Sequence, residues 1–263
     1  RGLLRSQWRV LYDIEDFLFM NNKIVVKNVC KTFNFFAGKT VQKNVALDNV
    51  SFEVEKGTCT VLAGENGSGK SLLMSIIAGL EKCNSGSVEV FGKVGIVFQE
   101  AETQILGDTV KDDVAFGLKN QKLKKEEINK KTEDALKKVG LFEKSSYNCR
   151  FLSGGEKRRL AIACMLALDF PILVLDEPYA NLDFLSIKSL NKLIEQLKNE
   201  GKTIIILSHE LEKCLALADK MIVLHKGKIV FDGTVKDGLL QDLEQWNLKN
   251  PICNYSKIED LIW

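Results

Sequence analysis

The segment GENGSGKS, residues 64–71, constrains the fold of this 263-residue chain more than any other. It follows the apolar run TCTVLAG, typical of a buried strand, and precedes SLLMSIIAGL, which has the apolar spacing of a helix. Glycines allow backbone N–H groups to surround phosphate oxygens, and the N-terminus of the next helix faces the same anion. The pattern therefore predicts a phosphate-binding loop, in which Lys70 reaches the β- and γ-phosphates and Ser71 ligates Mg²⁺. The alternative is a glycine-rich turn.

Composition and charge exclude several classes of protein. Hydrophobic residues make up 45% of the chain and charged residues 27%, which is typical of an ordered globular protein. The net charge is only +2, so we expect no nucleic-acid partner. Seven cysteines without a C-x-x-C pair indicate reduced thiols. The best candidate for a membrane span, residues 160–175, contains Asp169 and Pro171, so a membrane role requires another chain that spans the bilayer.

The segment ILVLDEP, residues 172–178, is an apolar strand that ends in two carboxylates. Ligands bind at the carboxyl ends of strands in α/β sheets. We therefore expect Asp176 to hold Mg²⁺ through water, and Glu177 to orient and deprotonate an attacking water. The alternative is an acidic N-cap for the next helix.

The segment LSGGEKRR, residues 152–159, begins a predicted helix with two adjacent glycines. Ser153 and Glu156 fit the S-x-x-E capping box, in which each side chain satisfies an exposed backbone N–H group. Glycine costs a helix interior about 1 kcal/mol relative to alanine, so a cap for stability alone does not explain Gly154 and Gly155. They indicate that an anion approaches the backbone at the positive end of this helix.

In this order, the three segments resemble those of the ATP-binding-cassette (ABC) ATPases, and the similarity covers about residues 23–233. The resemblance implies an α/β fold with a P-loop, a RecA-like mostly parallel sheet, an N-terminal antiparallel β-subdomain and a helical subdomain inserted at about residues 100–168. It also implies ATP and Mg²⁺ as cofactors. Two chains would sandwich each nucleotide between the phosphate loop of one and the LSGGE segment of the other.

The resemblance implies a role for each matching residue. Gln99 would contact Mg²⁺ and the attacking water, His209 the γ-phosphate, and Asp183 would lie in a loop that crosses between subunits. The catalytic residues are then Glu177, His209 and Gln99, and the magnesium residues are Ser71, Gln99 and Asp176. The segment that acts in trans is Ser153, Gly154, Gly155 and Glu156, where Glu156 replaces the usual glutamine. The nucleotide-binding residues are Phe33, Gly64, Glu65, Asn66, Gly67, Ser68, Gly69, Lys70, Ser71 and Leu72.

The aromatic platform for adenine is expected at Phe33, the sixth residue of NVCKTF. Phe35 and Phe36 compete for this role, and the remaining alternative is that Phe33 is a core aromatic at the end of a strand. Leu72 stands where the family often has threonine.

Residues 94–120 resemble the ATPases of energy-coupling-factor (ECF) transporters and of cobalt, nickel and biotin importers. Gln104 and residues 113–120 match, whereas Ala101 replaces a common proline. This implies a peripheral subunit at the cytoplasmic face of the cell membrane that energises import of a vitamin or transition-metal ion. Its partners would be a second ATPase subunit, identical or similar, an integral-membrane coupling protein and a substrate-binding membrane subunit. The alternatives are a conventional ABC transporter ATPase and a soluble ABC ATPase without a transport role.

The boundaries follow from the pattern at each end. Met20 opens a strand-like phrase, so we expect a leader at residues 1–19, an ABC ATPase domain at 20–240 and a short C-terminal extension at 241–263. The alternative for the leader is an amphipathic helix with one apolar face. The patterns also predict a polar loop at residues 34–44 and a helix at 210–219.

Overall fold

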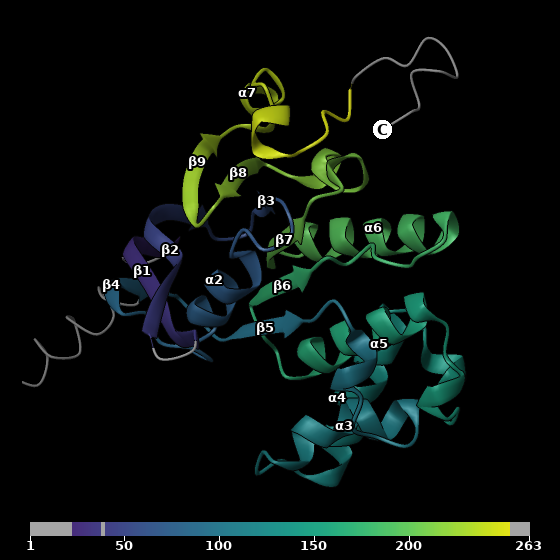
Figure 1. The fold of residues 1–263 in the computed structure, drawn as a ribbon. Coiled ribbons are helices and arrows are strands. Elements are labelled where there is room, and N and C mark those ends of the chain that lie inside the picture. The colour runs from purple at the N-terminus through teal and green to yellow at the C-terminus, as the bar shows by residue number, and fades with distance from the viewer. Residues whose placement is uncertain (1–22, 38–39, 253–263) are drawn as a thin grey trace, which may run out of the picture.

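The computed structural model describes residues 23–37 and 40–252, which form two sheets and several helices (Figure 1). The expected leader and its alternative helix lie outside the described residues. Within residues 23–37 and 40–252, no helix has the length and apolar character needed to cross a membrane.

A six-stranded sheet forms the centre of the molecule. Its strands are β3 (Cys59–Ala63), β5 (Val94–Val97), β6 (Ile172–Asp176), β7 (Thr203–Ser208), β8 (Lys220–His225) and β9 (Lys228–Gly233). Their order is β5-β6-β7-β3-β8-β9, and every neighbouring pair is parallel except β8 and β9. Because the strands are parallel, the carboxyl ends of β3 and β6 meet at one edge, where the phosphate loop and the acidic pair follow them.

Both faces of the sheet are covered at β3, β6 and β7, which are buried along their whole length, and this explains why these strands read as apolar runs. Val61 packs into the core that contains α5 (Gly154–Ala167) and α6 (Phe184–Asn199). Its neighbour Leu62 points to the other face and packs with α2 (Lys70–Ile77) and the second sheet. Successive strand residues therefore serve two separate cores.

The second sheet is antiparallel and has the order β2-β1-β4. Its strands are β1 (Lys23–Ala37), β2 (Thr40–Glu55) and β4 (Ser85–Glu89). The predicted fold class is thus confirmed, but the loop predicted at residues 34–44 is wrong, because both strands continue until Ala37 pairs with Thr40. Antiparallel pairing uses backbone groups, so polar side chains do not end the ladder.

A group of helices lies beyond β5 and β6 at one end of the molecule (Figure 1). It contains η1 (Ala101–Gln104), α3 (Val110–Lys119), α4 (Lys125–Lys138), η2 (Phe142–Lys144), η3 (Cys149–Phe151) and α5. Leu118, Leu136 and Leu160 from α3, α4 and α5 are all buried in one core. The helix that begins with the two glycines is therefore packed on both the sheet and the helical group.

The helix predicted at residues 210–219 is replaced by two short 3₁₀ turns, η4 (Leu211–Lys213) and η5 (Leu215–Leu217). Side chains of α6 bind the carbonyl groups of these turns. Asn191 Nδ2 donates to the carbonyl of Lys213 at 2.8 Å, and Lys198 Nζ to that of Leu217 at 3.1 Å. Tertiary hydrogen bonds thus replace the bonds of a continuous helix.

The segment expected to be an extension is attached to the domain. After α7 (Val235–Leu239), the short turn η6 (Glu244–Trp246) lies between the buried side chains of Leu243 and Leu248. The amide of Asn247 donates to the Glu65 carboxylate in the phosphate loop at 2.6 Å. Asn247 therefore joins this segment to the loop, and residues 253–263 lie outside the described part.

Candidate active site

The phosphate loop connects β3 to α2 through two glycines with left-handed backbone. Gly67 has φ 81° and Gly69 has φ 105°, backbone angles that residues other than glycine rarely adopt. A Cβ atom on Gly69 would also lie 2.9 Å from the carbonyl oxygen of Ala46 on β2. The loop conformation therefore depends on glycine, both for the backbone angle and for the approach of the second sheet.

Lys70 is held over this loop as a buried cation. Its Nζ donates to the carbonyls of Gly64 at 2.7 Å and Glu65 at 3.0 Å, and lies 3.6 Å from the Glu177 carboxylate. Burial lowers the pKa of Lys70, and the negative charges of Glu177 and Asp176 oppose this effect. The ammonium group is thus placed where it can exchange carbonyl partners for phosphate oxygens.

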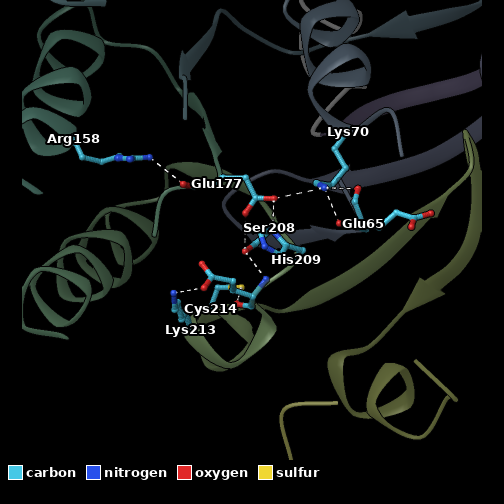
Figure 2. A network of polar contacts seen from close by, with 10 residues as sticks. Glu65, Lys70, Arg158, Glu177, Ser208, His209, Lys213 and Cys214 are labelled. Atoms are coloured by element: carbon cyan, nitrogen blue, oxygen red, sulfur yellow. Dashed lines mark hydrogen bonds and ion pairs between the residues drawn. The ribbon is translucent and has the colours of Figure 1, made fainter. Parts of the chain in front are cut away.

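Glu177 follows β6 in a strained conformation, with φ 42°. Its N–H donates to the carbonyl of Leu207 on β7 at 2.9 Å. One carboxylate oxygen lies 2.9 Å from His209 Nδ1, and the other accepts a hydrogen bond from Ser208 Oγ at 3.3 Å (Figure 2). A left-handed non-glycine residue costs about 1–3 kcal/mol and persists only where its surroundings hold it. Neighbours on β7 and the segment after it thus fix the position of this carboxylate.

A cavity of about 360 Å³ is lined by all three predicted magnesium residues and by most of the predicted phosphate loop, although Gly64, Glu65 and Ser68 are not part of its lining. Burial raises the pKa of Asp176, and the Ser71 hydroxyl and Lys70 ammonium oppose that rise. The hydroxyl, amide and carboxylate oxygens at this cavity fit Mg²⁺, which prefers oxygen ligands and is completed by substrate phosphates. The residues that line the cavity are Asn66, Gly67, Gly69, Lys70, Ser71, Leu72, Gln99, Asp176 and Glu177.

The LSGGE segment forms the predicted capping box. Ser153 Oγ accepts from the N–H of Glu156 at 3.3 Å, and the Glu156 carboxylate accepts from the N–H of Ser153 at 3.0 Å. Lys144 Nζ also donates to Glu156 at 2.6 Å. Burial favours the neutral acid, but the hydrogen bonds from Lys144 and the Ser153 backbone outweigh it and lower the pKa of Glu156. The side chain of Glu156 is therefore directed at the cap.

The two glycines of this segment have different surroundings, and at Gly155 the packing of the chain supplies a second reason for glycine beside the predicted approach of an anion. A Cβ on Gly155 would lie 2.8 Å from Ser186 Oγ on α6, so contact between two helices of one chain already requires a glycine. A Cβ on Gly154 would meet only Leu182, at an ordinary 3.7 Å. Gly154 and Ser153 are exposed, and residues 153–156 are not among the described residues that line the Lys70 cavity. The close approach of a ligand thus remains a prediction for both glycines, and at Gly154 no packing contact competes with it as the reason for glycine.

Replacing Gly155 with alanine should lower the free energy of unfolding by about 1–3 kcal/mol, because the methyl group overpacks the α5–α6 contact. Gly154→Ala is the matched control and should leave it unchanged or raise it by up to about 1 kcal/mol, because alanine favours the helix and its methyl group meets only Leu182. Urea denaturation of both variants measures the difference. Equal destabilisation would contradict the distinction between the two positions.

Two other predicted residues, Phe33 and Asp183, occupy definite places. Phe33 is 42% exposed, so its alternative as a core aromatic is wrong, and Lys31 Nζ lies 5.1 Å from its ring centroid. The side chains of Phe35 and Phe36 lie outside the described part. Asp183 caps α6 by accepting from the N–H of Ser186 at 2.7 Å. Since Asp183 caps that helix, the interpretation of Asp176 and Glu177 as its N-cap is wrong.

Several residues that contact the site were not predicted. Ser208 directly precedes His209, and Arg158 lies within LSGGEKRR, so both adjoin a recognised segment. Arg158 donates to the backbone carbonyl of Glu177, and Asn247 and His225 contact the side chain of Glu65. His225 Nδ1 lies 3.2 Å from Glu65. No local pattern indicates the last two contacts, because they depend on tertiary folding.

Comparisons with known proteins agree with this geometry. The family model described as ABC transporter matches residues 47–180. The energy-coupling factor transporter ATP-binding protein EcfA of Carboxydothermus hydrogenoformans is 39% identical over 248 residues, which cover 89% of each chain.

Two solved structures show the same similarity. The structure of cbiO1 from Clostridium perfringens, part of the ABC transporter complex cbiONQ, has a TM-score of 0.73, is 30% identical and covers 87% of this chain and 95% of that one. A dimeric ATP-binding cassette in a post-hydrolysis state bound to ADP and Pi has a TM-score of 0.70, is 27% identical and covers 81% of this chain and 98% of that one. With the phosphate loop, acidic pair and LSGGE segment in place, the chain belongs to the ATP-binding proteins of the ABC transporter family.

Proposed function

We propose that this chain is the ATP-hydrolysing subunit of an ECF-type importer. The observation that carries the proposal is the meeting of Lys70, Asp176 and Glu177 at one cavity, because it joins phosphate binding to a candidate general base. The 39% identity to an energy-coupling factor ATPase along nearly the whole of both chains supports the transporter type.

The residues of the cavity divide into binding and catalytic groups. Lys70 and the N–H groups of the loop bind the β- and γ-phosphates, and Glu177 accepts a proton from the attacking water. His209 and Ser208 each contact one oxygen of the Glu177 carboxylate. These contacts limit the rotation of the carboxylate at the cavity that Glu177 lines. Ser71, Gln99 and Asp176 would hold Mg²⁺, which neutralises charge that develops on phosphate oxygens.

A second copy or a similar chain would complete the site. Ser153 and Gly154 are exposed at the N-terminus of α5 and do not line the Lys70 cavity of their own chain among the described residues. The positive end of a helix suits an anion. We expect this segment to bind the γ-phosphate held by the partner's loop, with the dimer at the cytoplasmic face of the membrane on an integral-membrane coupling protein.

Mixing two inactive variants tests the shared site. Lys70→Met disables the loop, and Gly154→Asp places a negative charge where the partner's phosphate is expected. In a mixed dimer one composite site retains both intact parts, so the mixture should hydrolyse ATP well above either variant alone. A mixture that is no more active than its components would contradict a site built from two chains.

Capture of a tagged chain from detergent-solubilised membranes tests the transporter type. We expect an integral-membrane coupling protein and a small substrate-binding membrane protein to co-purify as separate chains. Mass spectrometry that finds instead the paired permease domains of a conventional ABC transporter would favour that alternative. Cargo bound to the small membrane protein would identify the vitamin or metal ion.

A further inference from the structure

The guanidinium group of Arg158 joins the LSGGE helix to the candidate base of the same chain. Arg158 lies on α5, five residues after the cap residue Ser153. Its Nη1 donates to the backbone carbonyl of Glu177 at 3.0 Å, across the space between the helical group and the end of β6 (Figure 2). In the proposed dimer, the N-terminus of α5 faces the nucleotide on the partner's phosphate loop. The same helix thus contacts Glu177, the candidate base for the nucleotide on its own chain's loop.

The contacted peptide is one whose geometry needs support. Glu177 has φ 42°, and its N–H is bonded to the carbonyl of Leu207. Its carbonyl, which precedes Pro178, accepts hydrogen bonds from Arg158 Nη1 at 3.0 Å and from the N–H of Ala180 at 3.2 Å. A strained residue keeps its conformation only when several contacts hold it. Among the described residues, Arg158 is therefore one of three backbone clamps on Glu177, beside the carbonyl of Leu207 and the N–H of Ala180, and it is the one that belongs to α5.

A contribution to the stability of the fold does not by itself explain an arginine at position 158. Arg158 is 5% exposed, and its Nε has no hydrogen-bond partner among the described residues. Burial lowers the pKa of its guanidinium, and the charge of Asp176 opposes that effect only partly. A buried cation with an unsatisfied donor is costly to the fold. An apolar side chain of similar length would pack at this position without that cost.

We propose that Arg158 is a positioning residue, which holds the Glu177 carboxylate in its reactive geometry and transmits movement of α5 to it. This inference rests on the proposed function, since it requires Glu177 to be the base. When the LSGGE end of α5 engages a partner's nucleotide, the helix and its guanidinium move together with the Glu177 peptide. In each chain, nucleotide binding at the site that contains its LSGGE segment would thereby affect the position of Glu177 at the other site of the dimer.

Kinetics of Arg158→Met test the assignment, with Arg159→Met as the matched control. Arg159 is the next residue on α5 and also donates to a backbone carbonyl, that of Val139 at 3.1 Å, but within the helical group. We expect Arg158→Met to lower kcat by about 10- to 100-fold, the scale of a misplaced catalytic group, with KM and the affinity for ATP unchanged within about twofold. Arg159→Met should leave kcat within about twofold.

A double-mutant cycle with Glu177→Gln separates positioning from general damage. If Arg158 acts through Glu177, Arg158→Met should cause little further loss of single-turnover rate in the Glu177→Gln background. Arg158→Lys, which keeps the charge, should recover part of the rate. An equal loss in both backgrounds, or a loss of ATP affinity that matches the loss of rate, would overturn the inference. If Glu177→Gln alone had no effect, the proposed base itself would be wrong.

Discussion

Replacing Glu177 with glutamine should reduce ATP turnover at least 100-fold while ATP binding persists. General base catalysis contributes about 10²- to 10⁴-fold, and an amide cannot accept the proton. Glutamine keeps the size of the side chain, so the cavity and the contact with Ser208 should be preserved. The Lys70 ammonium also remains, which retains the affinity for the phosphates. Steady-state phosphate release and equilibrium ATP binding measure the two quantities separately.

Trapping of the ATP-bound dimer is the second sign of the same variant. Without hydrolysis the nucleotide stays between the two chains, so size-exclusion chromatography with ATP should show a stable dimer. Glu212→Gln is the control, because it removes the same charge at an exposed position. Unchanged turnover in Glu177→Gln would remove Glu177 as the base.

Replacing Lys70 with methionine should weaken ATP binding by about 100-fold or more. Hydrogen bonds to charged groups contribute about 1.5–3 kcal/mol each, and every 1.4 kcal/mol is tenfold in affinity. Methionine keeps the apolar stem but loses the donors that now bond to the carbonyls of Gly64 and Glu65. Titration calorimetry with ATP and Mg²⁺ measures the change.

Lys228→Met is the matched control for Lys70→Met. Lys228 is 62% exposed and pairs with Asp48 at 3.0 Å. Its replacement therefore removes the same charge at an exposed position. Exposed ion pairs contribute about 0–1 kcal/mol to stability, and this variant should bind ATP as the unmodified chain does. Retained affinity in Lys70→Met would count against its phosphate role.

The sequence predicts what depends on contiguous residues. The phosphate loop requires glycines, lysine and serine at fixed spacing between a strand and a helix, and the structure has β3 and α2 on its two sides. The capping box of Ser153 and Glu156 is likewise a local motif, and it forms as predicted. The buried strand at residues 172–176 is predicted by its apolar run, because a strand that is covered on both faces of the sheet needs apolar side chains on both sides.

What the sequence does not predict depends on contacts between distant segments. Gly155 needs its small size because Ser186 of α6 packs against it, which no pattern within LSGGEKRR reveals. In place of the predicted helix at 210–219 there are two 3₁₀ turns, in which the carbonyls of Lys213 and Leu217 accept hydrogen bonds from Asn191 and Lys198 of α6. The clamp from Arg158 to Glu177 spans 19 residues of sequence and appears only when α5 packs on the sheet.

The hydrogen bond between Asn247 and Glu65 has a consequence for where the catalytic unit can be cut. The bond joins residues that are 182 positions apart and brings the last described segment onto the phosphate loop. A fragment that stopped after β9 would keep every recognised motif, yet it would lose this donor and the buried side chains of Leu243 and Leu248. The functional unit thus extends beyond its last motif, and a minimal version of the enzyme must include the segment that follows β9.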